Sequence, residues 1–106
     1  MDLRVLAGLV GNDADIIDEV LLAFRRSARQ SSHEMRNGVG RGSMPAVAEA
    51  SHKLKSAARS VGAGHLGELC AAIEDAAEGA RTTTVRELSE RIEAELTAVN
   101  DFLDAR

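Results

Sequence analysis

The chain has almost no aromatic residues: it contains two phenylalanines, no tryptophan and no tyrosine. Without aromatic rings that stack on bases, it lacks the usual means of holding single-stranded nucleic acid. The shortage of aromatic and β-branched runs also argues against a sheet and favours helices. A length of 106 residues is enough for one domain with its own core, which we expect to span residues 1–106.

Cysteine and long apolar runs are scarce as well. The single cysteine, Cys70, excludes an internal disulfide and favours a reducing compartment. No apolar run approaches the roughly 20 residues that cross a bilayer, and Asp2 and Arg4 interrupt the only apolar N-terminal stretch. The sequence therefore predicts a cytoplasmic protein without membrane insertion. A net charge of −4 argues further against nucleic acid as a partner, because phosphate backbones attract clustered positive charge.

The apolar residues recur at three- and four-residue steps, a pattern typical of amphipathic helices. The main helices are expected near residues 13–37, 44–61, 64–79 and 84–104, after a short helix within residues 2–9. With short connections, such helices most simply form an all-α, antiparallel up-down four-helix bundle with a short additional N-terminal helix. The apolar stripes also suit pairing with a second chain, so the oligomeric state stays open, with a monomer as the simpler expectation.

Local signals place the ends of these helices. Asn12 or Asp13 suits the cap of the first long helix, and three glycines within residues 38–42 predict the turn after it. Pro45 fits the first turn of the next helix. Thr84 and Glu87 match a capping box and predict the start of the last helix.

His52 lies on the polar face of the second main helix. At about 100° per residue, Leu54 in the core stripe lies roughly 160° away from it around the helix axis. The residues one turn before and after the histidine, Ala48 and Ser56, are both small. A large flat partner can therefore approach the imidazole without striking neighbouring side chains.

Several roles are open to a histidine in this position. On helical geometry alone, the most common one is that of a solvated surface residue. Metal binding is disfavoured, because His33 and His65 lie on other elements and the cations Lys55 and Arg59 beside His52 repel metal ions. A catalytic serine of the G-x-S-x-G type is also absent from the sequence.

The string HKLKSAARSVGA, residues 52–63, resembles the signature of histidine-containing phosphotransfer (HPt) domains of two-component phosphorelays. That signature has a histidine, any residue, a leucine, a lysine, a glycine, two small residues, two variable positions, an aliphatic residue and Gly-Ala. Phe24, in the preceding helix, matches a phenylalanine frequent in the family, and the resemblance extends over nearly the whole chain. Ser56 departs from the usual glycine, but serine is small enough to leave the histidine accessible.

The resemblance implies that His52 accepts a phosphoryl group from the aspartate of one receiver domain and passes it to the aspartate of another. It implies that Lys55 stabilises the phosphoryl charge, with Arg59 as a weaker candidate, and that Ala48 and Ser56 give the partner access. No cofactor or metal is expected on this chain, since the Mg²⁺ of the reaction belongs to the receiver. No P-loop or kinase domain is recognisable, so the expected role is a relay carrier without autonomous kinase activity.

A rival hypothesis is a helical module that docks on a receiver or an enzyme without carrying phosphate. The presence of both His52 and Lys55 favours the active carrier. With the turn placed at Gly40, His52 would lie opposite about residue 29, so exposed residues near Ser27 to Ser31 are candidate partner contacts. Cys70 falls on an apolar stripe and is predicted to be a core residue, not a redox sensor.

Overall fold

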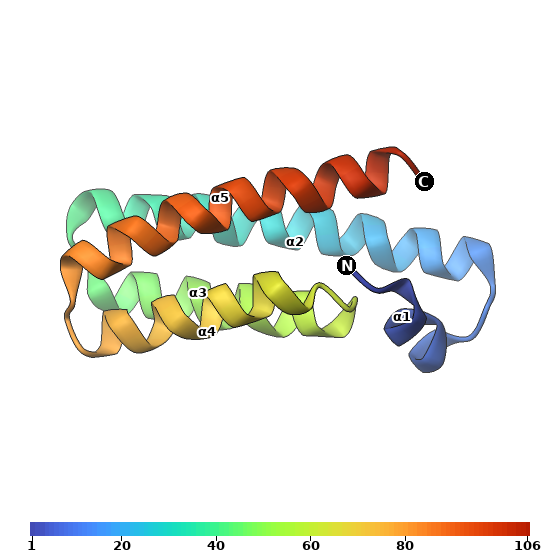
Figure 1. Cartoon of the computed structure of the whole chain (residues 1–106), viewed down its shortest axis with the longest axis horizontal. Coiled ribbons are helices and arrows are strands. Elements are labelled where there is room, and N and C mark those ends of the chain that lie inside the picture. The colour runs from blue at the N-terminus through green and yellow to red at the C-terminus, as the bar shows by residue number, and fades with distance from the viewer.

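The computed structural model describes all 106 residues and contains helices but no strand. The helices are α1 (Leu3–Val10), α2 (Ala14–Arg41), α3 (Met44–Ser60), α4 (Gly64–Glu78) and α5 (Thr82–Asp104). The four long helices, α2 to α5, run alternately in opposite directions and form an elongated bundle of 43 × 21 × 17 Å (Figure 1). The short α1 lies at the end of the bundle where α2 begins (Figure 1). The predicted all-α bundle with an additional N-terminal helix is therefore confirmed.

Aliphatic side chains from all five helices fill the interior of the bundle. The largest fully buried side chains include Leu6, Met35, Leu54, Leu66, Ile73 and Ile92. Cys70 is fully buried as predicted, and this burial raises the pKa of its thiol to about 12, so the thiol stays protonated at neutral pH. Among neighbouring long helices, α3 and α4 pack most closely and α2 and α5 least closely.

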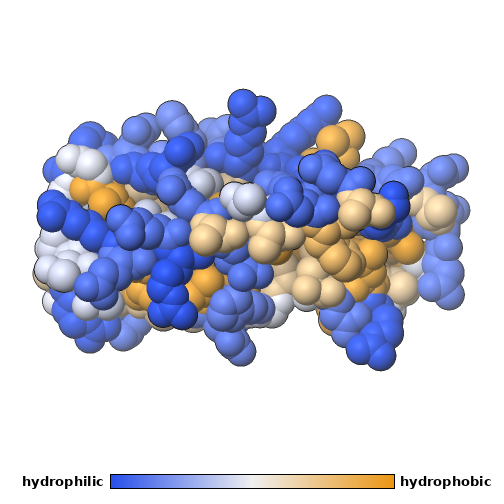
Figure 2. Space-filling view, turned by 45° about the horizontal axis from the view of Figure 1, so that its top comes forward, coloured by the Kyte–Doolittle hydropathy of each residue, from blue (hydrophilic) through white to orange (hydrophobic).

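The surface is mostly hydrophilic, but hydrophobic side chains gather toward the end that carries α1 (Figure 2). Val5 and Leu9 of α1 are 43% and 69% exposed, and Ile16 at the start of α2 is 42% exposed. None of the helices combines the length and the hydropathy that a membrane span requires.

Two of the predicted helix starts are confirmed. The side chain of Asp13 accepts hydrogen bonds from the backbone N–H groups of Asp15 and Ile16 and so caps α2. Pro45 lies in the first turn of α3, two residues after the Ser43 cap, where its missing N–H is of no consequence.

The turn between α2 and α3 comes later than predicted, because α2 continues through Gly38 and ends at Arg41. Gly38 is a packing position: a Cβ atom there would lie 3.0 Å from Cγ2 of Val47, so glycine allows α2 and α3 to approach closely. Gly42 reverses the chain with a φ of 68°, and its N–H donates to the Gly38 and Val39 carbonyls. The predicted end of the helix at residue 37 is therefore wrong.

The later turn also changes which part of α2 lies opposite His52. Nζ of Lys53 is 3.5 Å from Oε2 of Glu34, and the Ser51 hydroxyl donates to Sδ of Met35 at 3.6 Å. His52 therefore lies opposite residues near 34, about one and a half helical turns beyond the predicted position. Counting from Gly40 therefore gave the wrong part of α2 opposite His52, and Ser31 is buried. Whether the exposed residues near Ser27 to Ser31 contact a partner stays a prediction.

The start of α5 also differs from the prediction. The helix begins at Thr82, so Thr84 lies inside its first turn and does not cap it. The chain turns through Ala80 at a φ of 54°, and the N–H of Arg81 donates to the Ala76 carbonyl at 2.9 Å. The first residues of α5 are exposed, so water can satisfy their free N–H groups. The predicted capping box is therefore absent.

The N-terminal segment is attached to the turn between α3 and α4. The backbone N–H of Asp2 donates to the carbonyl of Gly62 at 2.9 Å, and Leu6 of α1 is buried. Gly62 has a φ of 77°, and a Cβ atom there would overlap the carbonyl oxygen of Asp2. Glycine at this position therefore allows both the turn and the attachment of α1.

Candidate functional site

His52 lies at the middle of α3, on the face turned away from the core. Its side chain is 62% exposed, whereas Leu54, two residues later, is completely buried. Helical periodicity thus placed the two side chains on opposite faces correctly. The one side chain bonded to the imidazole comes from the neighbouring helix α4: Nδ1 of His52 is 3.0 Å from Oε2 of Glu74.

Glu74 joins His52 to Lys55. Its Oε1 atom accepts a hydrogen bond from Nζ of Lys55 at 2.6 Å, while Oε2 faces the imidazole. Both residues are mostly buried, with side-chain exposures of 16% for Glu74 and 19% for Lys55. The hydrogen bond from Lys55 lowers the pKa of Glu74 below its ordinary value, burial opposes this shift, and His52 adds a smaller lowering contribution. Glu74 is therefore ionised at neutral pH.

The ionised carboxylate determines which ring nitrogen of His52 carries the proton. A carboxylate only accepts hydrogen bonds, so the Nδ1 atom facing Glu74 must be the donor in the neutral ring. The other nitrogen, Nε2, then has a free lone pair and no protein partner. In its neutral form, the ring therefore has Nε2 as its unprotonated nitrogen, on an exposed side chain that Glu74 orients through Nδ1.

The small residues on either side of His52 leave its ring uncovered. Ala48 is partly buried against the core, and Ser56 is exposed. A partner can therefore reach the His52 ring past these two side chains. That Ala48 and Ser56 serve partner access stays a prediction.

Arg59 lies two helical turns beyond His52 and is exposed. Its side-chain stem passes over α4, where a Cβ atom on Gly67 would lie 3.3 Å from Cγ of Arg59. The structure shows no hydrogen bond or ion pair from Arg59 to His52, Lys55 or Glu74. It brings Lys55 into the site and leaves Arg59 at its edge.

Glu74 is the member of the site that sequence reasoning missed. The sequence signature that begins at His52 and the helical periodicity around it describe only α3. Glu74 comes from α4, 22 residues after His52. The sequence nevertheless contained a signal for it. His52 lies 10 residues before Gly62, so in an antiparallel helix pair that turns at Gly62 it lies opposite about residue 72. Glu74 and Asp75 are the carboxylates nearest to that position.

The other two histidines have different surroundings. Nε2 of His33 lies 3.3 Å from the Asn37 side-chain amide on the same helix. Nε2 of His65 lies 3.6 Å from Oε2 of Glu95 on α5. Neither has a lysine linked to it through a shared carboxylate. His, Cys, Asp and Glu side chains do not gather anywhere in threes that could hold a metal ion.

Comparison with known proteins identifies the family of the chain. No curated protein and no solved structure matches it. The family model of the Hpt domain matches residues 19–102, which run from the first turns of α2 to near the end of α5. The match covers more than half of the chain and includes both His52 and Glu74. Since Hpt domains carry out histidine phosphotransfer in phosphorelays and interact with receiver domains, the fold, the exposed histidine and this match lead to one conclusion: the chain belongs to the Hpt domain family.

Proposed function

We propose that this chain is a phosphorelay carrier in which Nε2 of His52 takes a phosphoryl group from one receiver aspartate and gives it to another. The observation that carries the proposal is the exposed His52 ring with Nδ1 held 3.0 Å from the mostly buried side chain of Glu74. This contact leaves Nε2 as the nucleophile without any need for a separate general base.

The transfer step needs no proton to be added to or removed from Nε2. The Nε2 lone pair forms the new bond to phosphorus while the bond between phosphorus and the receiver's aspartyl oxygen breaks, and the aspartate leaves as a carboxylate. Because Nδ1 keeps its proton, the imidazole becomes positively charged. Glu74, ionised and within hydrogen-bond distance, stabilises that charge. The reverse sequence at a second receiver regenerates neutral His52.

Lys55 has the charge and the free donors to act on the phosphoryl group. Its ammonium has three N–H donors, of which the contact with Glu74 at 2.6 Å uses one. A remaining donor can bind a phosphoryl oxygen on His52, one helical turn away. Arg59 would contribute at the edge of the docked partner. The Mg²⁺ used in the transfer would be held by acidic residues of the receiver.

We expect Glu74→Ala to slow phosphorylation of His52 at least tenfold, both from a receiver and from the small donor phosphoramidate. The variant loses the stabilisation of the positive ring, and a tenfold effect requires only about 1.4 kcal/mol of added barrier. Alanine suits a helix, so the fold should persist, which circular dichroism would check. Glu78→Ala, an exposed position one turn later on α4, is the matched control. Equal rates in the two variants would contradict a role for Glu74 in the transfer.

Ser56→Gln should separate partner access from chemistry. Glutamine suits a helix interior, so folding should change little, but its longer side chain stands one turn from His52 where a receiver must approach. We expect transfer from a receiver to fall at least tenfold and the reaction with phosphoramidate to fall much less. Ser60→Gln, one turn further and also exposed, is the control. Equal losses with both donors would show that the small residue does not serve partner access.

A further inference from the structure

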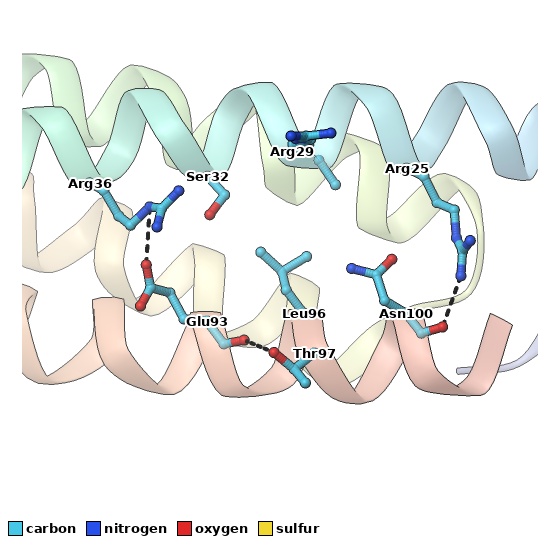
Figure 3. A pocket seen from close by; sticks show the side chains of 9 residues that line it. Arg25, Arg29, Ser32, Arg36, Glu93, Leu96, Thr97 and Asn100 are labelled. Atoms are coloured by element: carbon cyan, nitrogen blue, oxygen red, sulfur yellow. Dashed lines mark hydrogen bonds and ion pairs between the residues drawn. The ribbon is translucent and has the colours of Figure 1, made fainter. Parts of the chain in front are cut away.

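A cleft of about 520 Å³ lies between α2 and α5, along the seam where neighbouring long helices pack least closely (Figure 3). It lies apart from the His52 site, which α3 and α4 form. Three arginines of α2 line it, namely Arg25, Arg29 and Arg36, whereas Glu93 of α5 is the one acidic residue in its lining. The cleft therefore concentrates positive charge in a protein whose net charge is −4.

Contacts with α5 hold two of these arginines at opposite ends of the cleft (Figure 3). Nη2 of Arg25 donates to Oδ1 of Asp104 at 2.7 Å and to the Asn100 carbonyl at 2.8 Å. Nε of Arg36 is 3.1 Å from Oε1 of Glu93, although the pair lacks the alignment of a hydrogen bond. Nε of Arg25 is buried without any partner. Both guanidinium groups are thus oriented while keeping unused N–H donors.

Arg29 lies between these two along α2 and makes no hydrogen bond or ion pair. It also lines an adjacent hollow on the outer side of α2, together with Arg26 and His33. No acidic residue occurs between Glu19 and Glu34 to neutralise this stretch from within the helix. Arg29 therefore adds an uncompensated positive charge beside the cleft, between the two paired arginines.

Neutral hydrogen-bonding groups complete the cleft. Ser32 is only 8% exposed, and its hydroxyl is directed toward α5 without bonding to any of the residues drawn with it (Figure 3). The Thr97 hydroxyl, on the opposite wall, bonds only to the Glu93 carbonyl of its own helix. Ala28 and Leu96 are the only apolar residues in the lining. This chemistry suits an anion held by hydrogen bonds, not an apolar ligand.

We propose that the cleft binds a small soluble anion carrying two or more phosphate groups. Guanidinium forks bind phosphate oxygens in pairs, and the volume lies within the range of small-ligand sites. Arg25 and Arg36 are 11 residues apart, which corresponds to about 16 Å along the helix, so a single phosphate would not engage both ends. The lining has no aromatic ring, so recognition rests on the phosphate groups and not on base stacking.

The test is a titration with inorganic triphosphate, followed by calorimetry and by amide chemical shifts. We expect saturable binding to the wild type, with shifts that centre on Ser32, Thr97 and Asn100. Arg29→Gln should weaken binding at least tenfold. Arg91→Gln, which removes the same charge from an exposed position of α5 outside the cleft, should change it less than twofold. Bound triphosphate should also raise the unfolding temperature, because it bridges two helices of the folded state.

Four outcomes would overturn the proposal: no saturable binding, equal weakening in the two arginine variants, shifts centred on His52 and Lys55, or displacement of triphosphate by hexaglutamate at equal affinity. The last would reveal a carboxylate-docking surface in place of a phosphate site. His52→Gln should bind triphosphate as the wild type does. Failure of the cleft proposal and failure of the phosphorelay proposal can therefore be told apart.

Discussion

His52→Gln is expected to abolish phosphoryl acceptance while leaving the bundle folded. Glutamine has no nucleophilic ring nitrogen, yet its amide can still donate to Glu74. Because the native side chain is 62% exposed, we expect the free energy of unfolding to change by less than about 0.5 kcal/mol. The measurement is acid-labile, base-stable label on the chain after incubation with a phosphorylated receiver, with denaturant unfolding in parallel.

The remaining histidines supply matched controls for this variant. His33→Gln and His65→Gln remove the same ring from exposed positions on α2 and α4 and should accept label at the wild-type rate. Label appearing on His52→Gln at the wild-type rate would show that another residue is the acceptor.

Leu54→Ala is expected to lower the free energy of unfolding by about 2–5 kcal/mol, the usual cost of truncating a buried leucine. Leu54 is completely buried, so its removal leaves a cavity between helices that are closely packed. Denaturant unfolding would measure the effect as a lower midpoint at an unchanged slope. Under conditions where the variant is folded, His52 should still accept phosphate, because it lies on the opposite face of α3.

Leu9→Ala is the control for Leu54→Ala, because it truncates the same side chain at an exposed position. Leu9 of α1 is 69% exposed, so its side chain is already in contact with water. Its effect should stay within about 0.5 kcal/mol. A loss below about 1 kcal/mol for Leu54→Ala would contradict the position of Leu54 in the core.

Helical periodicity was sufficient to predict the bundle, because the spacing of apolar residues alone determines which face of each helix is buried. It placed Leu54 in the core and His52 in solvent without knowledge of the neighbouring helices. The end of α2 could not be predicted in the same way. Gly38 looks like a turn residue in the sequence, and only its contact with Val47 of α3 shows that it permits close helix packing. The error in locating the turn then displaced the residues that were counted as lying opposite His52.

The candidate site was predictable only as far as one helix extends. His52, Lys55, Ala48 and Ser56 share α3, so their relative positions follow from helical geometry. Glu74 does not, because its contact with the ring depends on how α4 packs against α3. The arginine-lined cleft depends in the same way on the open seam between α2 and α5, since spacing on α2 alone does not reveal a hollow.

The most direct test of the carrier function is transfer between two receivers. A receiver domain labelled on its aspartate is mixed with the chain, the first receiver is removed, and an unlabelled second receiver with Mg²⁺ is added. We predict that label appears on Nε2 of His52 and then moves to the second receiver's aspartate, with total label conserved apart from hydrolysis. A stable complex with the first receiver, without label ever reaching the chain, would contradict this account and identify a docking module instead.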